Sequence, residues 1–237
     1  MTHTTCVIVP SVNNPEELSI ALDGLLLQDK KIDEIVVVGP SNDPGRLIAE
    51  KKNIRFIDDK GSKNRADACN VAIESTTSDI ILFTDDDVIV PKTWAGSILK
   101  WYSREEVAGV GGPNFAPVDE STFWQKVIDV TFCSTIFTSG TNYGKVGINE
   151  LEEVDQLPGV NSSYRREVIE EAGGFDQHGK RQLCHQDVCG GAKTVLRQPL
   201  EFCNSSECEN YNNLVDKLNP YGTNFEEDLE KEINSRQ

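Results

Sequence analysis

Two features that would place the chain in a membrane or outside the cell are missing from the sequence. No apolar run approaches the roughly 20 residues that a membrane-spanning helix requires. A strand pattern begins at residue 5, which leaves no room for a signal peptide. We therefore expect a cytoplasmic protein without a transmembrane segment, in which most of the seven cysteines are reduced.

Positive charge is also scarce. The 23 Lys and Arg residues are outnumbered by 39 Asp and Glu residues, so the formal net charge is -16. Such a charge repels nucleic acid and anionic membrane surfaces, which excludes binding to either through a general basic patch. With 237 residues, of which 38% are hydrophobic, the chain can bury a substantial core.

Two glycine-rich motifs that bind phosphate groups are missing as well. No G-x-G-x-x-G follows the first predicted strand, which disfavours a dinucleotide site of the Rossmann type. The P-loop lysine motif is also missing. A ligand of this chain is therefore expected to be held by a metal and by loop groups.

The most informative stretch is an apolar run that ends in three carboxylates. Ile80 to Phe83 have the pattern of a short buried strand, and Asp85, Asp86 and Asp87 follow Thr84. A buried strand cannot carry three anions, so they belong at its carboxyl end, where open α/β sheets bind ligands. Adjacent carboxylates raise one another's pKa unless a cation such as Mg²⁺ or Mn²⁺ neutralises them. The alternative is an ordinary solvated acidic turn.

The rest of the first half alternates strand and helix patterns. Asn14 is a favourable N-cap before Pro15, and residues 61–64 open a helix whose inner face holds Ala68, Cys69, Ala72 and Ile73. Another helix pattern covers residues 94–102. Strand patterns lie at residues 5–9, 34–38, 54–57, 80–83 and 107–112. This alternation predicts one α/β domain with a mostly parallel sheet flanked by helices.

The second half has weaker patterns. Residues 123–137 are apolar and favour a helix, residues 138–149 favour a loop, and residues 165–172 favour a helix capped by serine and ended by Gly173-Gly174. Beyond Leu200 the chain is polar and acidic. We divide it into residues 1–200, with a nucleotide-sugar half (1–112) and an acceptor half (113–200), and a peripheral acidic tail (201–237).

Four pieces in this order resemble the family 2 glycosyltransferases of the GT-A fold. The resemblance spans roughly residues 5–190, and the pieces are residues 7–18, residues 65–70, Phe83 to Asp87 with Trp94, and residues 159–166 followed by 173–176. It implies transfer of a sugar from a nucleotide-diphosphate donor, with inversion, to a glycan or lipid-linked acceptor.

The resemblance also implies roles for individual residues. Asp85 and Asp87 would hold Mn²⁺ or Mg²⁺, Asp86 would instead face the ribose, and Arg65 would approach the pyrophosphate, unless it is a structural surface residue. Pro10, Ser11 and Val12 resemble the residues that line the base. The predicted donor-binding set is Pro10, Ser11, Val12, Asn14, Arg65, Asp85, Asp86 and Asn161.

Inversion requires a general base on the acceptor hydroxyl. The family has an acidic pair shortly after the Gly-Gly-Phe-Asp block, where this chain has His185-Gln186-Asp187. Asp187 is therefore the predicted base, and Gln186 replaces the usual first acid. His185 competes for the role because its ordinary pKa suits it.

The chain departs from the family at two places. Gly39-Pro40 stands where paired aspartates are common, which puts uridine specificity in doubt, and Asp43 lies further along. No histidine follows His185. A catalytically silent module that binds a nucleotide sugar or a partner is thus an alternative. A sugar-1-phosphate nucleotidyltransferase is another, but it would need a glycine-rich basic loop after the first strand.

Four cysteines cluster near the end of the sequence: Cys184, Cys189, Cys203 and Cys208. They form two pairs with four residues between the members, whereas zinc knuckles usually have two. A structural Zn²⁺ is one interpretation and unligated thiols are the other. Cys6, Cys69 and Cys133 lie on apolar faces and are expected in the core.

Overall fold

The computed structural model describes residues 3–112, 152–154, 157, 159–175 and 194–197. All of them belong to one compact unit, formed by Met1–Asn114 and Ile148–Phe202. The predicted helix at 123–137, the loop at 138–149 and the tail beyond residue 200 lie outside the described residues. The proposed boundaries at residues 112 and 200 therefore stay predictions.

The described residues form one eight-stranded sheet with the order β3-β2-β1-β4-β7-β5-β8-β6. Strands β1 to β4 pair in parallel, and β5 pairs in parallel with β8. Strand β7 runs antiparallel between β4 and β5, and β6 runs antiparallel to β8. The predicted mostly parallel sheet is confirmed. The strands are β1 (Thr5–Pro10), β2 (Glu34–Gly39), β3 (Arg55–Asp58), β4 (Ile80–Phe83), β5 (Val107–Gly111), β6 (Glu152–Glu153), β7 (Ser162–Arg165) and β8 (Thr194–Arg197).

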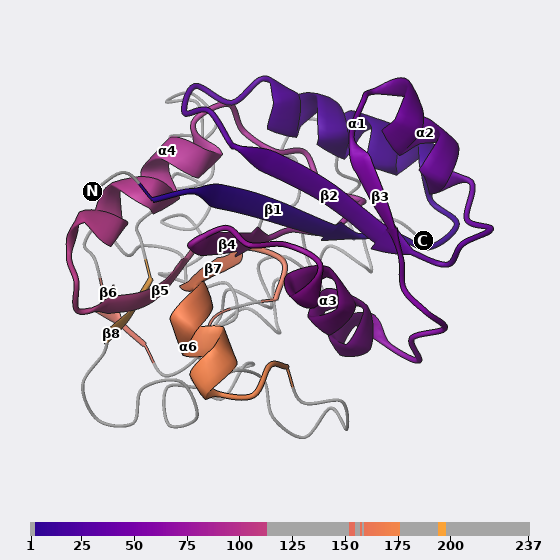
Figure 1. The fold of residues 1–237 in the computed structure, drawn as a ribbon. Coiled ribbons are helices and arrows are strands. Elements are labelled where there is room, and N and C mark those ends of the chain that lie inside the picture. The colour runs from indigo at the N-terminus through magenta and orange to yellow at the C-terminus, as the bar shows by residue number, and fades with distance from the viewer. Residues whose placement is uncertain (1–2, 113–151, 155–156, 158, 176–193, 198–237) are drawn as a thin grey trace, which may run out of the picture. The chain divides into compact units, whose positions relative to one another are not determined.

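Helices cover both faces of the sheet (Figure 1). On β1, Cys6 and Ile8 pack with α3 and α6, whereas Val7 and Val9 pack with α1, α2 and α4. This alternation follows from the two-residue repeat of a strand that is buried on both faces. The helices are α1 (Pro15–Leu26), α2 (Gly45–Lys51), α3 (Arg65–Glu74), α4 (Trp94–Leu99), the 3₁₀ helix η1 (Lys100–Ser103) and α6 (Arg166–Glu171).

One expectation was wrong at the entry to α6. The serines were expected to cap this helix, but Ser162 and Ser163 lie in β7, and α6 begins only at Arg166 without a side-chain cap. Pairing with β4 and β5 on both sides satisfies this backbone, and the Ser163 hydroxyl donates to the Val110 carbonyl at 2.7 Å.

The predicted end of α6 at Gly173-Gly174 is confirmed. Both glycines have a positive φ, of 78° and 85°, and the Gly174 N–H donates to the Ile169 carbonyl at 2.9 Å. In the part of the chain that the structure describes, no helix is long and apolar enough to cross a bilayer.

Candidate functional site

The candidate site lies at the carboxyl ends of β1 to β4, where four loops come together. The Ser11 N–H donates to the Val38 carbonyl at 2.9 Å, and the Asp59 N–H donates to the Gly39 carbonyl at 2.9 Å. These bonds join the first residues of the loops after β1 and β3 to the end of β2. The acidic loop after β4 completes the edge, because β4 pairs with β1 in parallel. This is the edge at which open α/β sheets bind ligands.

The three consecutive aspartates have three different environments. Asp85 is half-buried and paired with Arg65, Asp86 is buried, and Asp87 is exposed. Among the described residues, no three His, Cys, Asp or Glu side chains are grouped as a metal site. Asp85 and Asp87 could supply oxygen ligands from two nearby residues at a strand end, a donor type that fits a hard divalent cation.

Asp86 has an unusual environment for a carboxylate. It is 9% exposed, and its Oδ2 has no hydrogen-bond partner among the described residues. Burial raises the pKa of Asp86, the side chains of Ser11 and Asn14 partly offset this rise, and the charge of Asp87 adds to it. Repulsion between the carboxylates is thus a minor cause here, and desolvation is the main one.

A second unpartnered atom lies close to Asp86. The Ser11 hydroxyl oxygen is buried and makes no hydrogen bond of ordinary geometry to the residues that the structure describes, although it is near enough to lower the pKa of Asp86. A buried polar atom without a partner costs free energy, and native structures contain few of them. The Ser11 hydroxyl and Asp86 Oδ2 thus form a buried polar spot at the carboxyl ends of β1 and β4.

Asn14 occupies the N-cap position of α1, as expected, but its side chain accepts no capping hydrogen bond. Instead, its Nδ2 donates to Asp86 Oδ1 over 3.5 Å, a long contact. Asn14 therefore links the loop after β1 to the acidic loop.

Arg65 stands at the start of α3 and joins two parts of the site. Its Nε and Nη2 donate to Asp85 Oδ1 at 2.9 Å and 2.7 Å, and Nη2 also donates to the Gly159 carbonyl at 2.8 Å. Asn64 fixes the helix start, because its Oδ1 accepts from the Asp67 N–H at 2.9 Å. The guanidinium thus brings a positive charge to the acidic loop, where a pyrophosphate would require one.

The other predicted donor residues occupy varied positions. Pro10 ends β1, and Val12 is 59% exposed on the loop that follows it. Asn161 is buried, and its Oδ1 accepts from the Trp94 indole N–H at 3.0 Å. This bond explains why Trp94 accompanies the acidic motif, and it commits the Asn161 oxygen to holding the loop before β7.

Sequence reasoning overlooked one carboxylate and underestimated another. Asp59 follows β3, is 6% exposed, and accepts from the Gly61 N–H at 2.9 Å. Asp43 is 5% exposed and accepts from the N–H groups of Asn13 and Gly45, both at 2.7 Å. The signal for Asp59 was available, because it follows a strand pattern just as Asp85 does.

Several predictions fall on residues that the structure does not describe. They concern the base Asp187 with its neighbours Gln186 and His185, the core position of Cys133, and the possible zinc ligands Cys184, Cys189, Cys203 and Cys208. The other two core thiols are confirmed as buried. Burial raises the pKa of Cys69 to about 11 and that of Cys6 to about 12, so both thiols stay protonated and unreactive.

Comparison with known proteins identifies the family. The family model described as Glycosyl transferase family 2 matches residues 6–173, which include the four strand-end loops, Arg65 and Asn161. The chain belongs to glycosyl transferase family 2. The nucleotidyltransferase alternative is thereby set aside.

Two similar proteins illustrate this membership. The O-antigen chain rhamnosyltransferase RfbN of Salmonella typhimurium is 25% identical over 195 residues, which are 80% of this chain and 60% of the relative. The mannosyltransferase PcManGT from Pyrobaculum calidifontis, solved in complex with GDP-Man and Mn²⁺, superposes with a TM-score of 0.61 at 20% identity, over 89% of this chain and 60% of that one. The chain thus spans about 60% of the length of either protein. The structural likeness supports the GT-A fold.

Proposed function

We propose that this family 2 glycosyltransferase moves a sugar from a nucleotide-diphosphate donor to an acceptor hydroxyl, with inversion at the anomeric carbon. The observation that carries the proposal is the acidic loop at the carboxyl end of β4, with Asp85 held by Arg65 and Asp86 buried without a full set of partners. The complex of the similar mannosyltransferase with GDP-Man and Mn²⁺ supports the same donor class.

Asp85 and Asp87 would hold Mn²⁺ or Mg²⁺, which neutralises the charge that builds on the diphosphate as the glycosidic bond breaks. Arg65 orients Asp85 through its two nitrogens and adds a positive charge beside the same phosphates. The exposed carboxylate of Asp87 gives the site an open side toward the donor.

The nucleoside would lie against the loops that follow β1 to β3. The ribose would face Asp86, with the Ser11 hydroxyl beside that carboxylate. Pro10 and Val12 would flank the base, with Asn14 and Asn161 fixing the loops on either side. Because Gly39-Pro40 replaces the usual aspartates, the buried Asp59, whose N–H donates to the Gly39 carbonyl, would be the carboxylate that reads the base.

Asp187 is the proposed general base, which accepts the proton of the acceptor hydroxyl as that oxygen attacks the anomeric carbon. Gln186 beside it carries no charge, so no like-charge repulsion raises the pKa of Asp187. A glycan or lipid-linked acceptor in the cytoplasm completes the proposal. The name of the curated relative, an O-antigen chain rhamnosyltransferase, agrees with an acceptor of this kind.

The decisive experiment is a screen of nucleotide sugars, including GDP-mannose, for Mn²⁺-dependent thermal stabilisation and for hydrolysis. Both stabilisation and slow metal-dependent hydrolysis are expected for one donor. Stabilisation without any turnover would favour the silent binding module, for which the Gly39-Pro40 replacement is the supporting observation. Absence of both effects for every donor would contradict the proposal.

A further inference from the structure

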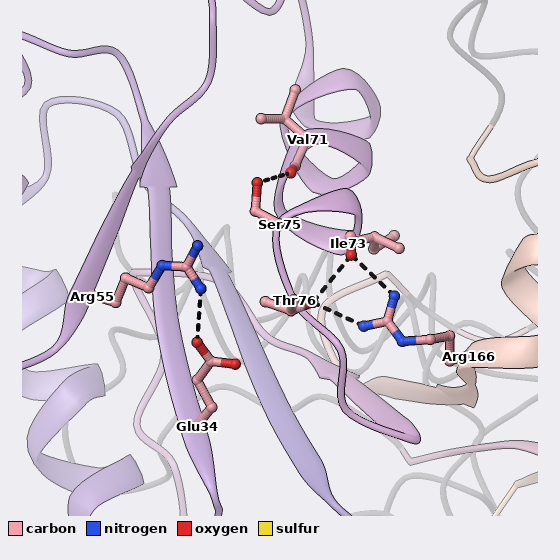
Figure 2. Close-up of polar contacts among 7 residues, drawn as sticks. All are labelled: Glu34, Arg55, Val71, Ile73, Ser75, Thr76 and Arg166. Carbon is pink, nitrogen blue, oxygen red and sulfur yellow. Dashed lines mark hydrogen bonds and ion pairs between the residues drawn. The ribbon is translucent and has the colours of Figure 1, made fainter.

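Helix α3 is tied to the block of residues 159–175 at three points along its length. At its start, Arg65 donates to the Gly159 carbonyl at 2.8 Å. In its middle, the Asn70 amide bonds to Phe175. At its end, Arg166 donates to the Ile73 carbonyl at 3.0 Å and to the Thr76 hydroxyl at 2.9 Å (Figure 2).

The hydrogen bonds in the middle of α3 require an asparagine at position 70. Asn70 Oδ1 accepts from the Phe175 N–H at 2.8 Å, and Asn70 Nδ2 donates to the Phe175 carbonyl at 2.9 Å. The side-chain amide thus pairs with one residue's main chain as a neighbouring strand would. An aspartate would place an oxygen against the Phe175 carbonyl, and an alanine would leave both main-chain groups without this partner.

The absence of a side chain at the neighbouring Gly174 leaves room for these two hydrogen bonds. A Cβ on Gly174 would lie 2.8 Å from Asn70 Oδ1, so no side chain fits there while the bond is made. Its φ of 85° also favours glycine. The chain therefore turns tightly after α6 and presents Phe175 to Asn70.

Phe175 is fixed from a second direction by the donor-side strand. Its ring meets the ring of Phe83 edge-on, with centroids 5.1 Å apart and planes at 88°. Phe83 is fully buried and precedes Asp85 by two positions. Helix α3 thus holds Asp85 through Arg65 and, about 7.5 Å further along its axis, holds Phe175, which packs against the last residue of β4.

We propose that Asn70 is a positioning residue for sugar transfer, which keeps the acceptor side of the protein in register with the donor site. The proposal rests on the function proposed above. Phe175 is the point from which the chain leads on to Asp187, and Asn70 sets that point relative to Arg65 and Asp85. In-line attack requires the reacting atoms to be aligned, and an error of about 1 Å can cost a hundredfold in rate. Attack by water does not depend on a positioned acceptor.

The test compares Asn70→Ala and Asn70→Asp with wild type and with a control at the C-cap of the same helix, Ser75→Ala. The Ser75 hydroxyl donates to the Val71 carbonyl at 2.7 Å and takes no part in the three ties, so the control loses one bond at the end of α3 and leaves the ties intact (Figure 2). Three quantities are measured on the full chain. They are GDP and UDP affinity with Mn²⁺, the rate of donor hydrolysis, and the rate of transfer to a panel of alkyl glycosides.

Both Asn70 variants are expected to keep nucleotide affinity within about twofold and to lower the ratio of transfer to hydrolysis roughly tenfold or more. Ser75→Ala should leave the ratio unchanged. A purely structural role would lower both rates together, in proportion to the folded fraction measured by circular dichroism, and that result would overturn the proposal for either variant. If wild type shows no Mn²⁺-dependent binding or turnover, the proposed function itself is wrong. A normal ratio in an active Asn70 variant refutes only the role of Asn70.

Discussion

Two nitrogens of the Arg65 guanidinium donate to one oxygen of Asp85, Nε at 2.9 Å and Nη2 at 2.7 Å. The two residues are 20 positions apart and belong to the start of α3 and to the acidic loop. Both side chains are partly exposed, at 37% and 27%, so a ligand can reach them. The pair fixes the orientation of the first carboxylate of the loop before any ligand binds.

Replacing Arg65 should therefore affect binding more than folding. Arg65→Ala is expected to weaken Mn²⁺-dependent nucleotide binding roughly tenfold, or by about 1.4 kcal/mol. The free energy of unfolding should change by less than about 1 kcal/mol, since partly exposed ion pairs contribute little. Arg65→Lys keeps the charge but cannot donate two hydrogen bonds to Asp85, so its nucleotide affinity should lie between those of wild type and Arg65→Ala. Calorimetry measures both quantities.

The matched control is Arg46→Gln, which removes an exposed ion pair with Glu50 on α2. This variant should bind nucleotide as wild type does. Unchanged affinity in Arg65→Ala would show that the guanidinium serves only to hold the Gly159 loop.

Nucleotide binding should depend on a divalent metal, and this dependence should require Asp85 and Asp87. Calorimetric titration with GDP or UDP is expected to show binding that requires Mn²⁺ or Mg²⁺ and is lost in the double variant Asp85→Ala/Asp87→Ala. The reason is that oxygen ligands from the loop are needed to hold the cation between protein and diphosphate. Asp58→Ala, which changes an exposed aspartate on the edge strand β3, is the control. Equal affinity in the presence of a chelator would contradict the metal site.

Asp86 should give the protein a measurable pH dependence. Its pKa in the folded protein is raised above the ordinary value of 3.8, chiefly by burial, so the folded state binds its proton more tightly than the unfolded state does. The contribution of this group to stability is therefore lost as the pH rises from about 3.8 through the folded pKa. Asp86→Asn removes the ionisation, and its stability relative to wild type should rise over that pH range.

Denaturant titrations of both proteins at several pH values test this expectation. The substitution should also weaken nucleotide binding, because the amide nitrogen cannot accept a hydrogen bond as the carboxylate oxygen does. A stability difference between the two proteins that is the same at every pH would show that Asp86 titrates normally.

The parts of the fold and of the candidate site that the sequence predicts are those that depend on local interactions. The buried strands and the acidic loop were predictable because their apolar runs and the residues that end them are contiguous. Strand β7 was not, because Ser162 and Ser163 are polar and lie in a strand only through pairing with β4 and β5, both distant along the chain.

Individual side chains of the site show the same limit. The local pattern correctly placed Asn14 at the start of α1, but its amide turns to Asp86, 72 positions away. The partner of Arg65 and the use of Asp43 to hold two loops likewise depend on the folded arrangement. A sequence pattern names the residues at the edge of the sheet, whereas their partners are set by which loops meet there.

The turn after α6 offers a test of the tie to Asn70 through stability alone. Gly173 and Gly174 both have a positive φ, but a Cβ on Gly173 would meet nothing within 4 Å, whereas one on Gly174 would lie 2.8 Å from Asn70 Oδ1. Gly173→Ala should cost about 1–2 kcal/mol for the backbone conformation alone. Gly174→Ala should lower the free energy of unfolding by more than Gly173→Ala does. This extra loss should be smaller when Gly174→Ala is made in the Asn70→Ala protein. Thermal unfolding of wild type, the three single variants and the Gly174→Ala/Asn70→Ala double variant measures this, and equal costs for the two glycines would contradict the close contact.

The last prediction concerns the base. Asp187 follows the Gly173-Gly174-Phe175-Asp176 block at about the distance at which the family has its catalytic carboxylate. Asp187→Asn keeps the shape of the side chain and removes its basicity, so donor and metal binding should stay nearly intact while transfer falls by roughly 10²–10⁴-fold. His185→Gln is the control and should cost far less. Initial rates of transfer, measured beside nucleotide affinity, separate the two residues. If the His185 variant is inactive and the Asp187 variant transfers normally, the imidazole is the base, and the likeness to the family fails at the residue that performs the chemistry.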